Sequence, residues 1–142
     1  MMRPSDPAFL KRLSILVVGV HSIVLGVAML FAPIRFLSLA RWPYPPAHDP
    51  FFASQSGIFL IILGVAYLAA LRHGVLVWLI VGSKLAAVLF LFGHGLFGGA
   101  PFQVMLLGAA DACLGLLVVA GVMAEQSARA HASAQEEAPP RQ

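Results

Sequence analysis

Four long apolar segments dominate the pattern of hydrophobic and polar positions along the chain. Each segment has about the 20 residues that a helix needs to cross a hydrocarbon core of about 30 Å. The pattern therefore predicts an all-α protein, a four-helix transmembrane bundle. We expect its spans at about residues 13–32, 53–71, 75–96 and 102–124.

The first segment begins like a secretory signal, because Lys11 and Arg12 precede its apolar run. The run is longer than the apolar region of a signal peptide, and no A-x-A-like cleavage site follows it directly. We expect an uncleaved first helix, with a signal anchor as the alternative.

The connection between the first two spans has a helical pattern of its own. Pro33 suits the first position of a helix, and Arg35, Ser38 and Arg41 recur every three residues as one polar stripe. Apolar residues cover the other sides, so we predict a short helix lying in the membrane interface. It acts as an anchor, or alternatively as a lid over an outward-facing pocket.

The remaining connections are short, which makes consecutive spans antiparallel neighbours. "RHG" at 72–74 joins spans two and three, and "GHGLFGGAP" joins spans three and four. Residues 125–142 lack apolar periodicity and are rich in Ala, Glu, Gln and Pro. We expect them to form a disordered cytoplasmic tail after a membrane domain of residues 1–124.

The composition agrees with a membrane protein, since 60% of the 142 residues are hydrophobic and 11% are charged. The formal net charge is +3, but the basic residues flank apolar segments and do not gather with aromatic residues. The distribution of basic residues therefore indicates how the chain is oriented in a membrane and does not indicate nucleic-acid binding.

In a four-span arrangement, most basic residues lie on the same side of the membrane as both termini. We therefore predict a protein of the cell (inner) membrane with both termini in the cytoplasm. On that side lie Arg3, Lys11, Arg12, Arg72, Arg129 and Arg141.

Glycines recur at a spacing of seven residues within three of the spans. "LGVAML" at 25–30 is echoed by "LGVAYL" at 63–68 and by "LGLLVV" at 114–119, and each has a second glycine seven residues before its own. Seven residues is about two helical turns, so each pair forms a groove that lets a neighbouring backbone approach. We predict close packing at these positions, with a ligand slot as the alternative. They are Gly19, Gly26, Gly57, Gly64, Gly108, Gly115 and the adjoining Ala112.

Lys84 and Asp111 place opposite charges near the middle of the third and fourth spans. A charge at that depth costs about 2.5 to 3.5 kcal/mol on insertion scales, so it is usually partnered. Asp111 shares its helix face with glycines, which directs the carboxylate toward a helix interface. We therefore predict an ion pair between the two side chains.

Three further polar side chains lie at a similar depth. Ser22 and Ser83 are placed to extend a hydrogen-bond network around the pair. His21 points roughly 160° away from the glycine stripe of its own helix, so it joins the pair only if that helix turns its other face inward.

A buried acid and base with an imidazole nearby are compatible with several functions. The pair can fix helix register, bind or translocate a small molecule or proton, or take part in general acid and base catalysis. No motif defines a substrate, and no nucleophile is paired with a base. We expect a non-enzymatic accessory or structural subunit, with a small-molecule or proton-coupled binder or transporter as the alternative.

No cofactor or metal ion is expected, because His48, Asp49 and His94 lack the spacing of metal ligands. The expected partner is the lipid bilayer. A membrane protein partner and a homo-oligomer both stay open.

Three stretches, "SQSGIFLIILGVAYLAALRHG", "VGSKLAAVLFLFGHG" and "LLGAADACLGLLVVAG", resemble small bacterial four-helix membrane proteins of the DoxX-like kind. The resemblance covers about residues 12–124 and rests on hydropathy spacing, glycines and a late Asp. It implies a compact four-span bundle. Most proteins of this kind have no assigned activity, some are linked to accessory roles beside membrane oxidoreductases, and no catalytic residue carries over.

Overall fold

The computed structural model describes residues 7–39, 41 and 51–136, and its described part contains helices, turns and no strand. The helices are α1 (Pro7–Phe31), α2 (Pro33–Leu39), α3 (Phe51–Ala69), α4 (Leu76–Phe97) and α5 (Phe102–Glu136). The predicted fold class, an all-α bundle with a short helix between the first two spans, is confirmed.

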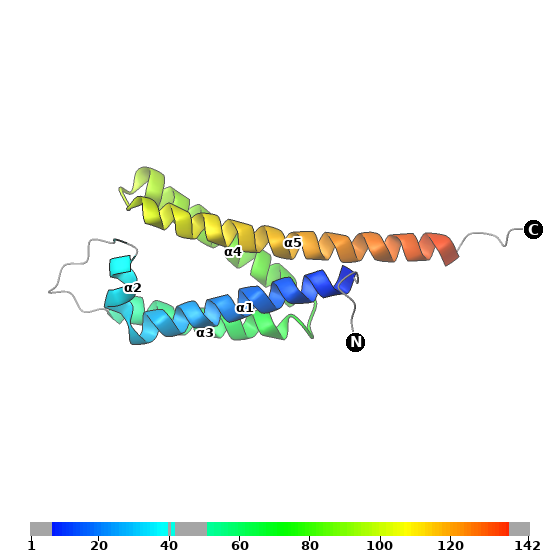
Figure 1. Ribbon diagram of the computed structural model, residues 1–142, viewed down its shortest axis with the longest axis horizontal. Helices are drawn as coiled ribbons and strands as arrows, with labels where there is room; N and C mark the ends of the chain where they lie inside the picture. The colour runs from blue at the N-terminus through cyan, green and yellow to red at the C-terminus, as the bar shows by residue number, and fades with distance from the viewer. Residues whose placement is uncertain (1–6, 40, 42–50, 137–142) are drawn as a thin grey trace, which may run out of the picture.

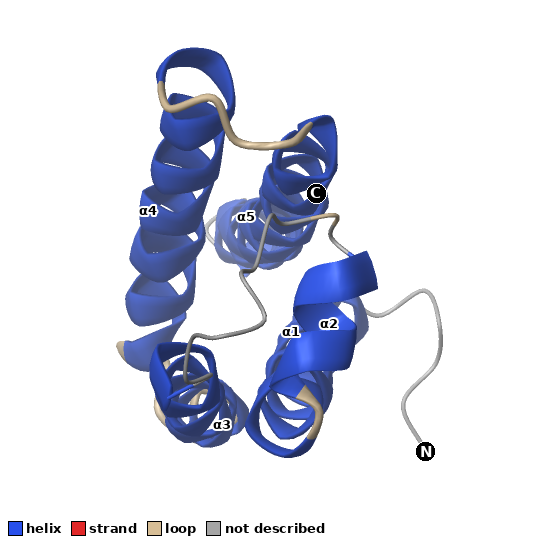
Figure 2. Ribbon diagram, turned by 90° about the vertical axis from the view of Figure 1, so that its left-hand side faces the viewer, coloured by secondary structure: helices blue, strands red, loops and turns tan. Residues whose placement is uncertain are grey.

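The helices form two antiparallel hairpins, α1 with α3 and α4 with α5 (Figures 1 and 2). We call the end with the start of α1 and the 70–75 turn the terminal end, and the end with α2 and the 98–101 link the loop end. Figure 1 shows the hairpins separating toward the loop end. Contact between the hairpins runs mainly through α1 and α5, whereas α3 and α4 touch little despite the short turn that joins them.

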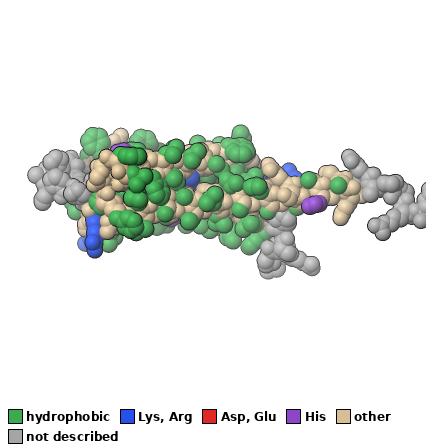
Figure 3. All heavy atoms as spheres, turned by 90° about the horizontal axis from the view of Figure 1, so that it is seen from above, with side chains coloured by type: hydrophobic (Ala, Val, Ile, Leu, Met, Phe, Trp, Pro, Cys, Tyr) green, Lys and Arg blue, Asp and Glu red, His purple; other side chains and the backbone are tan. Residues whose placement is uncertain are grey.

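Four of the helices, α1, α3, α4 and α5, are long and apolar enough to cross a membrane. Hydrophobic side chains cover much of the face drawn in Figure 3. Large apolar residues such as Val24, Leu85 and Leu116 are more than half exposed, at 62%, 58% and 68%. Such surfaces suit contact with lipid tails, and we conclude that the chain is a multi-pass membrane protein.

The hydrophobic core lies toward the terminal end, where the two hairpins meet. Each of the four long helices contributes buried side chains to it, and the described residues of the loop end contribute none. The cluster consists of Ile15, Val18, Tyr67, Ala70, Val77, Ile80 and Val118. This position of the core agrees with the separation of the hairpins at the opposite end.

Glycines let α1 and α3 pack at backbone distance. A methyl group at Gly64 would lie 2.8 Å from the carbonyl oxygen of Gly19, and Gly26 faces Gly57 in the same way. The seven-residue spacing thus places both glycine pairs in the contact between these helices. It works because two turns of helix return a residue to the same face.

α5 continues to Glu136, so the segment expected to be disordered from residue 125 is helical through residue 136. Alanines, which favour helix strongly, recur along this segment, and Glu125 forms an i,i+4 ion pair with Arg129 at 2.6 Å. Residues 125–136 lack an apolar face because this part of α5 extends beyond the other helices and packs against little of the bundle (Figure 1). Residues 137–142 of the expected tail lie outside the described residues.

Candidate functional site

Lys84 of α4 and Asp111 of α5 form an ion pair inside the bundle. The ammonium Nζ lies 2.5 Å from the carboxylate Oδ1, and the two side chains are 8% and 17% exposed. The structure thus brings together the two charges that the sequence placed at matching depth. Their burial against each other keeps both charges away from the hydrocarbon.

The glycines of α5 explain how the lysine reaches the carboxylate. A methyl group at Gly115 would lie 3.3 Å from Cβ of Lys84, so the lysine stem packs against the bare backbone one turn from Asp111. Two turns earlier, Gly108 makes similar room for the ring of Phe92. Small residues on α5 therefore seat α4 closely enough for the pair to form. Ala112, on the same helix, is half-buried.

A second polar contact links α3 to α4 beside the ion pair. The hydroxyls of Tyr67 and Ser83 are hydrogen-bonded, and the Ser83 hydroxyl donates to the carbonyl of Ile80 at 2.9 Å. Since serine has one proton to donate, the Tyr67 hydroxyl donates to Ser83. Tyr67 was not singled out from the sequence. Its signal was the replacement of Met29 in "LGVAML" by a phenol in the echoing "LGVAYL".

Ser22 and His21 do not join the hydrogen bonds around the pair. Ser22 is 1% exposed, yet its Oγ has no hydrogen-bond partner among the described residues. His21 is exposed. Adjacent helical residues lie about 100° apart, so α1 turns Ser22 into the bundle and leaves His21 on the outside.

An apolar hollow of about 270 Å³ adjoins the ion pair in the seam between α4 and α5. Both charged residues line it, but every other lining residue is aliphatic or glycine. These are Val81, Leu85, Val88, Ala112, Gly115, Leu116 and Val119. The ion pair therefore borders an apolar hollow and not an open polar channel.

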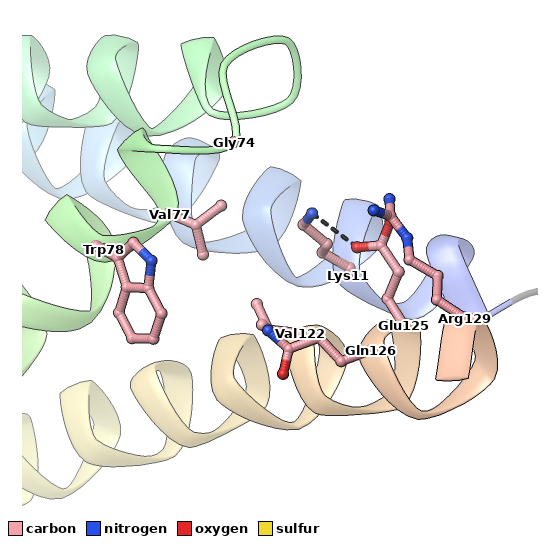
Figure 4. A pocket seen from close by; sticks show the side chains of 8 residues that line it. All are labelled: Lys11, Gly74, Val77, Trp78, Val122, Glu125, Gln126 and Arg129. Atoms are coloured by element: carbon pink, nitrogen blue, oxygen red, sulfur yellow. Dashed lines mark hydrogen bonds and ion pairs between the residues drawn. The ribbon is translucent and has the colours of Figure 1, made fainter. Parts of the chain in front are cut away.

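A second ion pair joins α1 to α5 at the terminal end (Figure 4). Lys11 Nζ lies 2.7 Å from Glu125 Oε2, and Arg129 binds the other oxygen of the same carboxylate. The helices approach closely here, since a methyl group at Gly121 would lie 2.7 Å from Cα of Lys11. The sequence predicts for Lys11 only a role in orienting the chain in the membrane. Gly121 was not predicted, because it falls outside the seven-residue glycine spacing.

The described residues include no group of three His, Cys, Asp or Glu side chains close enough to hold a metal ion. What the central site offers is a matched acid and base. Such a pair holds two helices in one arrangement or, if its charge balance changes, handles a proton.

Four membrane-length helices with a buried Lys–Asp pair place this chain among multi-pass membrane proteins with a charged centre. No known protein family, curated protein or solved structure matches the chain.

Proposed function

We propose that the protein is a non-enzymatic accessory or structural subunit of the cell (inner) membrane. The observation that carries this proposal is the closed Lys84–Asp111 pair, in which each charge neutralises the other at 2.5 Å. Buried opposite charges add little net stability compared with apolar residues, but they can specify one arrangement of two helices. A bundle held in one arrangement offers a fixed surface to a partner subunit. The resemblance to DoxX-like proteins points to the same kind of role.

The orientation that we propose has both termini in the cytoplasm. The terminal end carries four described Lys and Arg residues, which are Lys11, Arg12, Arg72 and Arg129. The loop end carries two described basic residues, Arg35 and Arg41. This imbalance follows the positive-inside rule. A reporter enzyme that is active only in the cytoplasm should be active when it is fused after Gln142. A fusion protein that inserts into the membrane but is inactive would indicate the opposite orientation.

Purification from native membranes under mild detergent tests the accessory role. An accessory subunit should bring a partner membrane protein in fixed stoichiometry, measured by quantitative mass spectrometry of the purified complex. Recovery of the chain alone, or only with partners in variable amounts, would argue against this role.

The double variant Lys84→Met/Asp111→Leu separates a structural pair from a working one. If the pair only fixes helices, the variant should insert, fold and retain its partner at the wild-type ratio. Asp111→Asn alone supplies the contrast, since it leaves the lysine with no carboxylate.

A small-molecule or proton-coupled binder is the second candidate, and two observations favour it. Ser22 has a buried hydroxyl without a described partner, and the 270 Å³ hollow lies directly beside Lys84 and Asp111. In that case the double variant should fold normally but lose binding or transport. Proton uptake by reconstituted vesicles, with and without the double change, distinguishes the two candidates.

A further inference from the structure

The hollow drawn in Figure 4 lies at the terminal end, where the start of α4 faces α1 and α5, and has a volume of about 170 Å³. Its lining combines charged and apolar side chains, unlike that of the apolar hollow between α4 and α5. Lys11, Glu125 and Arg129 line one end of it. The ring of Trp78 lies at the other end, and Val122 lies between the two (Figure 4).

One carboxylate serves two cations in this hollow. Oε2 of Glu125 accepts a hydrogen bond from Nζ of Lys11 at 2.7 Å, and Oε1 accepts one from Arg129 at 2.6 Å. Among the described residues that line the hollow, Glu125 is the only acidic one, so one positive charge has no counter-charge. An ammonium has three N–H groups and a guanidinium has five. Since each cation gives one hydrogen bond to Glu125, both keep N–H groups for a ligand.

The apolar part of the hollow lies deeper in the membrane than the charged part. Val122 precedes Glu125 by three residues on α5, which is about 4.5 Å closer to the membrane centre, and Arg129 lies about 6 Å further out than Glu125. Trp78 is 67% exposed near the start of α4, and tryptophan rings are typical of the membrane interface. A phospholipid has the same order, with its phosphate at the interface and its acyl chains extending inward.

We propose that this hollow binds one anionic phospholipid, with its phosphate beside Lys11 and Arg129 and the start of an acyl chain along Trp78 and Val122. Guanidinium groups match phosphate oxygens with paired hydrogen bonds, and basic pockets between membrane helices bind acidic lipid head groups. The uncompensated positive charge favours a lipid with a net negative charge. Free phosphate shares the polar contacts but makes no use of the apolar side chains. This site is independent of the accessory role proposed above.

The test compares lipids that differ only in their head group. The full chain in detergent is titrated with phosphatidylglycerol or phosphatidylcholine of identical acyl chains, and native mass spectrometry measures the bound fraction. The wild-type protein should bind phosphatidylglycerol about fivefold more tightly, which is the contribution of one basic residue near a membrane surface. Arg129→Gln should remove this preference, because Lys11 and Glu125 then neutralise each other at 2.7 Å.

Arg72→Gln is the matched control. It removes one exposed positive charge at the same end of the molecule, but Arg72 does not line this hollow, so the lipid preference should stay unchanged. Glu125→Gln should act in the opposite direction and raise the affinity for phosphatidylglycerol about fivefold, because both cations lose their counter-charge.

Three outcomes of these titrations overturn the proposal. They are equal affinity of the wild-type protein for both lipids, an equal loss in Arg129→Gln and Arg72→Gln, and the absence of a gain in Glu125→Gln. Displacement of the bound lipid by an excess of inorganic phosphate also overturns it and indicates a free-anion site.

Discussion

Gly26 of α1 and Gly57 of α3 face each other so closely that a methyl group on either would lie 2.6 Å from the carbonyl oxygen of the other. The two backbones are therefore in contact, and neither position has room for a side chain. Lipid tails are as apolar as leucine, so helices in a membrane associate largely through such close packing. This contact should account for much of the stability of the α1–α3 hairpin.

Gly26→Ala is accordingly expected to lower the free energy of unfolding by about 1 to 3 kcal/mol, the usual range for an overpacked contact. Denaturant unfolding in detergent, followed by circular dichroism, measures the change. Gly82→Ala in α4 is the control, because an added methyl group there meets nothing within 4 Å. The control should be neutral or slightly stabilising, by up to about 1 kcal/mol. Equal behaviour of the two variants would mean that α1 and α3 do not touch here.

Lys84→Met should destabilise the protein by about 3 to 5 kcal/mol, because it leaves the Asp111 carboxylate buried without a counter-charge. Adding Asp111→Leu should recover most of the loss, since the apolar pair has no charge to desolvate. A double-mutant cycle of unfolding free energies measures this coupling. Additive losses from the two changes would show that the side chains do not interact.

Tyr67→Phe removes the hydrogen bond that links α3 to α4 and should reduce stability by about 0.6 kcal/mol, the average for hydrogen bonds between membrane helices. Ser83 retains its bond to the carbonyl of Ile80, so the variant leaves no serine hydroxyl unpaired. Once Tyr67 is changed, Ser83→Ala should have little further effect on unfolding. A full additional loss would assign Ser83 a different partner.

Glu125→Gln should weaken the packing of the start of α1 against α5, because it removes the Lys11–Glu125 ion pair that joins these two helices at the terminal end. The expected effect is about 1 kcal/mol, at the upper end for a pair only partly shielded from solvent. Hydrogen exchange of residues 8–15 should then speed up about fivefold. Arg129→Gln is the control, since the Arg129 side chain is 77% exposed and its removal should leave the exchange of α1 unchanged.

Properties that depend on local sequence were predictable. The four spans follow from apolar segment length, because a chain in lipid must satisfy its backbone hydrogen bonds within each helix. The ion pair was anticipated for a similar reason, since Lys84 and Asp111 are deep in consecutive antiparallel helices and neither tolerates isolation in hydrocarbon. The end of α5 was not predictable in this way, because an apolar pattern marks where a helix leaves the membrane and not where it stops.

The sequence by itself determined which segments cross the membrane, which helix faces carry glycine, and at what depth the charges lie. Only the tertiary structure decided how each helix is rotated and where the two hairpins separate. Those choices bury Ser22 and leave His21 exposed, and they bring Tyr67 to Ser83 and Lys11 to Glu125. The physical reason is that helix rotation and separation are set jointly by the packing of all four long helices, whereas span length and depth are properties of one helix at a time.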